Sequence, residues 1–167
     1  MRIYFIGIGG ISMSALAHML KHFGYRVSGS DRSETKITKQ LADNGFAITI
    51  GHDAASITNP DLVCYTAAIS QDNPELVKAR SLDIPVMERA ELLGQLMKNY
   101  KFPIAVAGTH GKTTTTYLVK HVLEDLGYKV IKYKEFKSVK YNVDFECAWN
   151  YTFDKFNVFL LEEYEKV

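Results

Sequence analysis

The sequence predicts an α/β protein with a Rossmann-like parallel sheet in an N-terminal domain, followed by a partial P-loop domain. Two observations favour this fold class. Short apolar runs alternate along the chain with segments whose apolar residues recur at helical spacing, the pattern of a doubly wound sheet. A glycine-rich loop also follows an apolar run twice, at 7–10 and at 108–111. Such junctions between a strand and a helix are common phosphate-binding places.

The first hundred residues justify the parallel sheet. Residues 2–8 form a near-continuous apolar run, which is typical of a strand buried on both faces. Residues 12–23 have the periodicity of a helix, and Gly24 fits the position just after a helix end. Further strands are expected at 25–28, 46–50, 61–65 and 84–87, and further helices at 33–44, 74–82 and 89–99. Cys64 lies in one of the apolar runs and is expected in the core.

A boundary is expected at 100–103, which divides the chain into domains 1–100 and 101–167. Beyond it, an apolar strand at 104–107 leads into the second glycine loop, and a helix at 113–126 ends before Gly127. Strands are expected at 128–133 and 157–161, whereas residues 134–156 mix aromatic, charged and polar types without a clear period. One helix with two or three strands predicts an incomplete second domain.

Composition excludes several classes of protein. The 167 residues carry a net charge of +1, which gives no electrostatic reason to expect a nucleic-acid partner. No apolar run approaches the roughly 20 residues needed to span a membrane, and no signal peptide is visible. The two cysteines suit a reducing compartment. A cytoplasmic protein that binds neither nucleic acid nor a membrane is expected.

The second glycine loop has the chemistry of a nucleotide site. Its residues are Gly108-Thr109-His110-Gly111-Lys112-Thr113-Thr114. Backbone amides and the following helix N-terminus would bind phosphate oxygens, Lys112 would add a charge, and the Thr113 hydroxyl could coordinate Mg²⁺. The usual P-loop pattern requires glycine at position 106, where this chain has Val106.

The first glycine loop, Gly7-Ile8-Gly9-Gly10, allows a tight turn and close approach of a diphosphate to the backbone. The dinucleotide pattern would place glycine at position 12, where this chain has Ser12, so the loop is a weak sign of a nicotinamide cofactor. Asp31 follows the second expected strand. Its carboxylate could bind a ribose or a base, or it could be a solvated loop residue.

Both loops resemble those of the Mur ligase family, the ATP-dependent amino-acid ligases of peptidoglycan synthesis. The second loop resembles the ATP loop of the family. The first loop with the following Met13-Ser14-Ala15-Leu16-Ala17, and the stretch Val27-Ser28-Gly29-Ser30-Asp31, resembles the branch that joins L-alanine to UDP-N-acetylmuramate. Three later stretches agree in order: Gly51-His52, Ala67-Ala68-Ile69 with Asn73-Pro74-Glu75, and Ile84-Pro85-Val86 with Arg89-Ala90-Glu91. The resemblance covers residues 1–126, and Ser12 departs from the family's usual glycine.

The resemblance implies two sets of site residues. The first domain would hold the UDP part of UDP-N-acetylmuramate through Gly9, Gly10, Ser12, Asp31, His52, Thr66, Ala67 and Ile69. ATP would be bound by Gly108, Thr109, His110, Gly111, Lys112, Thr113 and Thr114, with Lys112 as the catalytic residue. Mg²⁺ would be held by Thr113 and Glu162. Two of these assignments have alternatives, because His52 could be a loop residue satisfied within the protein and Glu162 could belong to a solvated acidic end.

In the family reaction, ATP activates the lactyl carboxylate of UDP-N-acetylmuramate as an acyl phosphate, which the amine of L-alanine attacks. Lys112 and Mg²⁺ would stabilise charge on the transferred phosphoryl group. The later residues of the family are absent, so a truncated or short form that is not competent alone is expected. Two other functions remain open: a non-catalytic module that binds a sugar nucleotide, and an NAD(P)-dependent oxidoreductase on the same fold.

Overall fold

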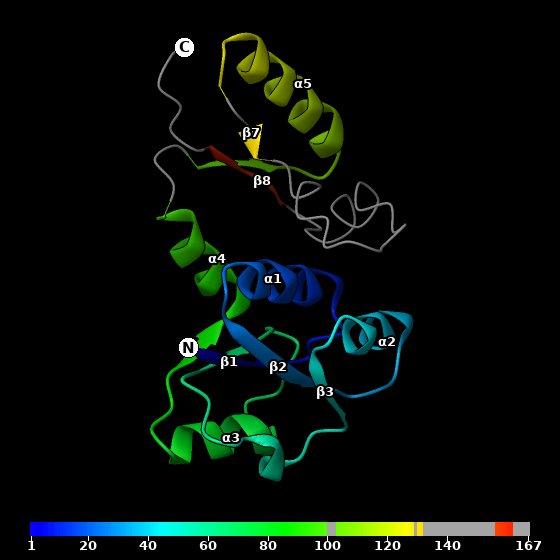
Figure 1. The fold of residues 1–167 in the computed structure, drawn as a ribbon, viewed down its shortest axis with the longest axis vertical. Coiled ribbons are helices and arrows are strands. Elements are labelled where there is room, and N and C mark those ends of the chain that lie inside the picture. The colour runs from blue at the N-terminus through cyan, green and yellow to red at the C-terminus, as the bar shows by residue number, and fades with distance from the viewer. Residues whose placement is uncertain (100–102, 129, 132–155, 162–167) are drawn as a thin grey trace. The chain divides into compact units, whose positions relative to one another are not determined.

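The structure is a computed structural model that describes residues 1–99, 103–128, 130–131 and 156–161 (Figure 1). The chain forms two compact units, Met1–Leu93 and Gly94–Val167. The division falls within helix α4 (Arg89–Met97).

The first unit contains a five-stranded parallel sheet with the order β3-β2-β1-β4-β5. Its strands are β1 (Arg2–Ile6), β2 (Arg26–Asp31), β3 (Ala47–Ile50), β4 (Leu62–Tyr65) and β5 (Val86–Glu88). Its other helices are α1 (Ile11–His22), α2 (Lys36–Asp43), the 3₁₀ helix η1 (Ala54–Ser56) and α3 (Pro74–Ser81). Helices α1 and α2 cover one face of the sheet and α3 covers the other (Figure 1). The predicted α/β fold with a parallel sheet is confirmed, and the strand order reverses direction between β1 and β4.

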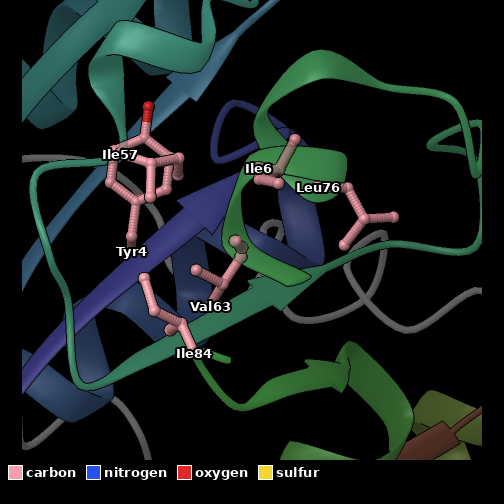
Figure 2. Packing of buried hydrophobic residues seen from close by; sticks show 7 residues of the cluster. Tyr4, Ile6, Ile57, Val63, Leu76 and Ile84 are labelled. Atoms are coloured by element: carbon pink, nitrogen blue, oxygen red, sulfur yellow. The ribbon is translucent and has the colours of Figure 1, made fainter. Parts of the chain in front are cut away.

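The core of this unit lies on both faces of the sheet, because successive side chains of a strand point to opposite faces. Tyr4 and Ile6 of β1 belong to a buried cluster on the α3 face, shown in Figure 2. The other buried members of the cluster are Ile57, Val63, Leu76, Ala79 and Ile84. Cys64 of β4 is fully buried, as predicted, and burial raises the pKa of its thiol to about 12.

Glycine ends helices α1 and α2, and the sequence predicts Gly24 at the first of these ends. Gly24 has φ +84°, its N–H donates to the Lys21 carbonyl at 3.0 Å, and the next N–H, of Tyr25, donates to Leu20 at 3.0 Å. Gly45 ends α2 in the same way, with φ +73°. A residue with positive φ closes the last turn while satisfying carbonyls that the helix leaves free.

Helix α2 begins at Lys36, three residues later than the sequence predicts. The reason is a reciprocal cap. The Thr35 hydroxyl accepts from the Thr38 N–H at 3.2 Å, and the Thr38 hydroxyl accepts from the Thr35 N–H at 2.8 Å. This pair of bonds satisfies two amides at the helix start and fixes Thr35 as the residue before the first turn.

The second unit contains β6 (Ile104–Ala107), α5 (Lys112–Asp125), β7 (Val130–Ile131) and β8 (Phe156–Leu161). The strand order is β6-β8-β7, and β8 runs antiparallel to both neighbours. Strand β6 and helix α5 lie where the sequence predicts them. One side of α5 packs through Leu123 with Ile104 and Val106. Four other apolar side chains are more than half exposed: Tyr117, Leu118, Val122 and, just beyond the helix, Leu126.

The side chain of His18 in α1 packs against Phe46, the residue before β3. Its ring meets the edge of Phe46, with 4.9 Å between the ring centroids. Burial, and to a lesser extent the positive charge of Lys21, lowers the pKa of His18 from 6.5 to about 4. The unfolded chain therefore binds a proton at His18 at pH values where the folded chain does not.

We expect this difference to make the first unit less stable in acid. The contribution of His18 is fully present above the unfolded pKa of 6.5 and is lost as the pH falls toward 4. Allowing for its partial exposure, a loss of about 1–2 kcal/mol is expected between pH 7 and pH 4.5. Urea unfolding across this range should show a smaller loss for His18→Gln, which cannot titrate. Equal losses for both proteins would contradict this assignment.

Candidate functional site

The candidate site lies at the carboxyl ends of the parallel strands. The glycine loop 7–10 follows β1, Asp31 ends β2, and Thr66 follows β4. The loops after β1 and β4 leave the sheet where its strand order reverses. In open α/β sheets, ligands bind in the crevice that forms outside the strands at this point.

The glycine loop is held tightly by its neighbours. The N–H groups of Gly7 and Ile8 both donate to the Ser30 carbonyl at 2.9 Å, and the Gly9 N–H donates to Asp31 Oδ2 at 2.8 Å. A Cβ atom on Gly9 would lie 2.8 Å from Asp31 Oδ2 and 2.7 Å from Thr38 Cγ2. The structure thus gives a reason for Gly9 that the sequence does not: its lack of a side chain lets Asp31 reach the loop.

The first turn of α1 supplies amides that can bind an anion. Gly10 precedes the helix, no side chain caps it, and the first turn contains no acidic residue. The N–H groups of Ile11, Ser12 and Met13 meet no acceptor in the described part of the chain. An uncapped helix N-terminus carries partial positive charge and suits a phosphate group.

The loop after β4 lies beside the glycine loop. A Cβ atom on Gly7 would lie 3.1 Å from Thr66 Cγ2 and 3.6 Å from Ile69 Cδ1. The loop is closed by two bonds to Thr66: the Ala68 N–H donates to its hydroxyl at 3.2 Å, and the Ile69 N–H to its carbonyl at 2.9 Å. Ala67 is exposed at the turn. The structure therefore places the loop that contains Thr66, Ala67 and Ile69, which the resemblance assigned to the UDP-sugar site, beside the glycine loop.

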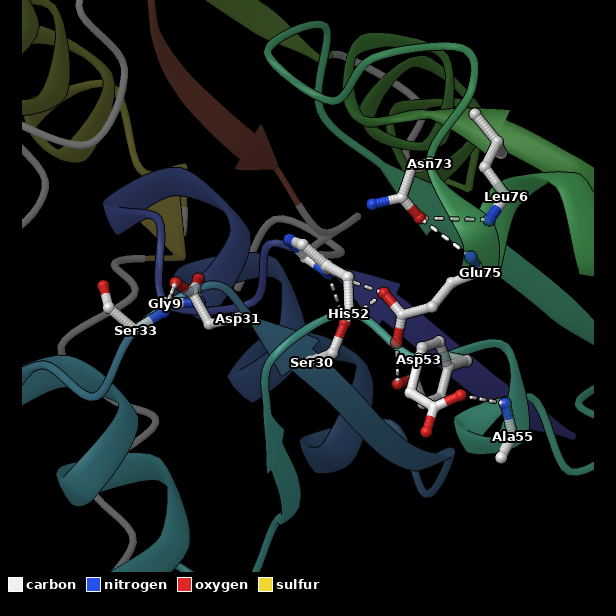
Figure 3. Close-up of polar contacts among 11 residues, drawn as sticks. Gly9, Ser30, Asp31, Ser33, His52, Asp53, Ala55, Asn73, Glu75 and Leu76 are labelled. Carbon is white, nitrogen blue, oxygen red and sulfur yellow. Dashed lines mark hydrogen bonds and ion pairs between the residues drawn. The ribbon is translucent and has the colours of Figure 1, made fainter.

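His52 contacts residues that sequence reasoning did not assign to the site. Its Nδ1 lies 2.7 Å from Glu75 Oε2 and 3.3 Å from the Ser30 hydroxyl (Figure 3). The Tyr4 hydroxyl donates to the other oxygen of Glu75 at 2.7 Å. No local pattern identifies this group, because its members are far apart in sequence. The one sign in the sequence is Tyr4, which lies among the apolar residues of β1.

The second glycine loop also precedes an uncapped helix. Gly111 precedes α5 with φ +75°, and no side chain caps the first turn. Lys112 Nζ donates to the loop's own carbonyls, to Gly108 at 2.7 Å and to Thr109 at 3.3 Å. An amide-lined turn, a lysine and the Thr113 hydroxyl fit a nucleotide phosphate with Mg²⁺.

Glu162, the other predicted Mg²⁺ ligand, lies outside the described residues. Among the residues whose placement is described, no group of three or more His, Cys, Asp or Glu side chains could hold a metal ion.

No helix in the described segments combines the length and apolar character needed to cross a membrane.

Comparison with protein families identifies two matching segments. Residues 2–101 match the family described as "Mur ligase family, catalytic domain", and residues 106–157 match "Mur ligase middle domain". The first match contains the glycine loop, and the second contains the loop at 108–111.

Curated relatives and solved structures agree with these matches. The chain is 57% identical over 122 residues to UDP-N-acetylmuramate–L-alanine ligase of Alkaliphilus metalliredigens, and 57% identical over 121 residues to that of Clostridium novyi. These alignments cover 73% and 72% of this chain but 26% of each relative. The chain therefore spans about a quarter of the length of the curated relatives.

The crystal structure of UDP-N-acetylmuramate-alanine ligase from Thermotoga maritima matches with a TM-score of 0.68 and 44% identity, over 76% of this chain and 30% of that one. A UDP-N-acetylmuramate:L-alanyl-γ-D-glutamyl-meso-diaminopimelate ligase from Neisseria meningitides matches with a TM-score of 0.66 and 31% identity, over 75% and 40%.

Proposed function

The chain belongs to the Mur ligase family, and from this premise we propose that it is part of an ATP-dependent ligase that joins L-alanine to UDP-N-acetylmuramate. The observation that carries the proposal is 57% identity to curated ligases with that activity. The first unit would bind the sugar nucleotide, and the second would begin the ATP-binding domain.

Within the first unit, we assign the diphosphate to the start of α1. The amides of Ile11, Ser12 and Met13, which meet no acceptor among the described residues, and the Ser12 hydroxyl are suitable donors for its oxygens. Gly9 and Gly10 would shape the turn below it. Asp31 and His52 would lie near the uridine, and Thr66, Ala67 and Ile69 would line the sugar-phosphate side.

Within the second unit, we assign the ATP phosphates to residues 108–114, with His110 making local hydrogen bonds. Lys112 would exchange the carbonyls of its own loop for phosphate oxygens and stabilise charge on the transferred group. Thr113 and Glu162 would hold Mg²⁺, which supplies positive charge to the phosphate oxygens when bound.

The test of the sugar-nucleotide assignment is calorimetry on the 167-residue protein. We expect UDP-N-acetylmuramate to bind and NADH not to bind, which separates a ligase domain from an oxidoreductase of similar fold. Binding of NADH without binding of UDP-N-acetylmuramate would overturn the proposal.

We expect Lys112→Met to weaken ATP binding by about 10- to 100-fold, because a charge-assisted contact contributes about 1.5–3 kcal/mol. Methionine keeps the aliphatic stem and removes the ammonium group. Lys98→Ala, which removes a lysine that is not in the loop, is the matched control and should retain wild-type affinity. ATP affinity is measured by fluorescence titration. Equal affinity in Lys112→Met and the wild type would show that ATP does not bind at residues 108–114.

A further inference from the structure

Glu75 is a fully buried carboxylate at the start of α3. It follows Pro74, and the Asn73 side chain accepts from the Glu75 and Leu76 N–H groups at 3.0 and 3.2 Å. The helix N-terminus favours a negative charge here, but an acidic side chain at such a position can equally well stay in water. Burial of this carboxylate is costly unless other groups hydrogen-bond to it.

Three hydrogen-bond donors surround this carboxylate, as Figure 3 shows for His52 and Ser30. The Ser30 hydroxyl donates to Oε2 at 2.6 Å and the Tyr4 hydroxyl donates to Oε1 at 2.7 Å. His52 Nδ1 lies 2.7 Å from Oε2. An ionised carboxylate can only accept, so in contact with one, Nδ1 acts as the donor and the imidazole takes the tautomer with a proton on Nδ1.

The backbone on both sides of His52 is also fixed. Before it, the Gly51 N–H donates to the Asp31 carbonyl at 2.8 Å. After it, the Asp53 carboxylate accepts from the Ala55 N–H at 2.9 Å and caps η1. The imidazole is thus held at its backbone and at one ring nitrogen.

The second ring nitrogen, Nε2, is the part of His52 that remains available. It lies across the ring from Nδ1, the side chain is 19% exposed, and no atom of the described residues forms a hydrogen bond with it. Gly51 follows β3, and its N–H donates to the carbonyl of Asp31, the last residue of β2. His52 therefore lies at the carboxyl edge of the sheet.

Resting on the proposed function, we infer that Glu75 is a positioning residue of the sugar-nucleotide site. Its carboxylate holds the Nδ1 proton of His52 and directs Nε2 toward the bound UDP-sugar. Tyr4 and Ser30 hold the carboxylate in turn. A buried acid that hydrogen-bonds to one ring nitrogen of a histidine fixes the tautomer of the ring and the direction of the other nitrogen.

The wild-type protein offers a first test through the ¹⁵N resonances of its histidines, with His52→Ala used to assign the His52 signals. We expect Nδ1 of His52 to be protonated without ligand, and the Nε2 resonance to shift when UDP-N-acetylmuramate saturates the protein. An Nε2 resonance that does not move on saturation would overturn the inference.

A double-mutant cycle on ligand affinity is the second test. Glutamine at position 75 removes the charge and offers one acceptor oxygen to three donors, so Glu75→Gln should weaken UDP-N-acetylmuramate binding about tenfold. The same change made in a His52→Ala background should weaken it no further, because Glu75 acts through His52. Equal weakening in both backgrounds would show a merely structural role and would overturn the inference.

Asp43→Asn is the matched control. It makes the same change from carboxylate to amide on an exposed residue of α2 that lies outside the group around Glu75. The ligand affinity should stay within about twofold of the wild type, since this side chain has no part in holding His52. If the wild type bound no UDP-N-acetylmuramate, the proposed function would fail first and this inference with it. If the wild type bound but the cycle were additive, the inference alone would fail.

Discussion

Replacing Ser12 with aspartate is expected to weaken UDP-N-acetylmuramate binding at least about hundredfold while making the first unit more stable. Ser12 lies in the first turn of α1, which has no capping side chain and no acidic residue. A carboxylate there interacts favourably with the helix dipole, by about 0.3–1 kcal/mol. The same charge about 4 Å from a diphosphate is unfavourable by about 4 kcal/mol per charge pair near a surface, of which salt screens a part.

Opposite changes in stability and affinity make this experiment selective, because a variant that is damaged in its fold would lose both. Ser12→Asn is the matched control, with a similar shape and no charge, and it should retain affinity within about tenfold. Calorimetry gives the affinity and urea unfolding gives the stability. Wild-type affinity in Ser12→Asp would show that the diphosphate does not bind at the start of α1.

The largest loss of stability is expected for Gly29→Ala. Gly29 lies in the middle of β2, paired with Phe5 of β1 and Ile48 of β3. A Cβ atom there would lie 2.4 Å from the Phe5 carbonyl oxygen and 3.0 Å from Ile8 Cδ1. The clashing oxygen belongs to the backbone of a central strand and cannot rotate away. We expect the free energy of unfolding to fall by about 3 kcal/mol or more.

Gly94→Ala makes the same chemical change where, among the described residues, only the adjacent residues and the backbone of its own helix lie within 4 Å of the added carbon. Gly94 is within α4, so alanine should leave stability unchanged or raise it by up to about 1 kcal/mol. Thermal or urea unfolding of both variants measures the contrast. A Gly29→Ala protein as stable as the wild type would mean that β1 and β2 do not approach as closely as the structure shows.

Much of the first unit could be predicted because its signals are local. The run before the glycine loop is apolar, and Gly24 and Gly45 end their helices through a backbone conformation that most residues avoid. The late start of α2 was missed because two threonines cap each other, and the usual glutamate or glutamine is absent from the third position of the helix. The antiparallel pairing of β8 was not predicted, since strand direction depends on the connection between strands rather than on their residues.

The candidate site also has parts that could be predicted from local signals and parts that could not. The two loops could be located because closely spaced glycines between a strand and a helix are seldom needed for packing alone. The group around Glu75 was missed because Tyr4 and Glu75 are 71 positions apart, and each residue suits its local element. Tyr4 fits an apolar strand, and Glu75 fits the first turn of a helix. Only the folded chain shows that both belong to the group that holds His52 at the carboxyl edge of the sheet.

Cys64 gives the first unit a built-in kinetic reporter. Its thiol is fully buried on β4 opposite Phe5, and burial raises the pKa of the thiol to about 12. The thiolate is the form that attacks alkylating reagents, so Cys64 should react only during openings that separate β1 from β4. With Cys147, which lies outside the described residues, replaced by serine, the labelling rate would count these openings directly. A ligand seated at the carboxyl edge would slow the labelling in proportion to its occupancy.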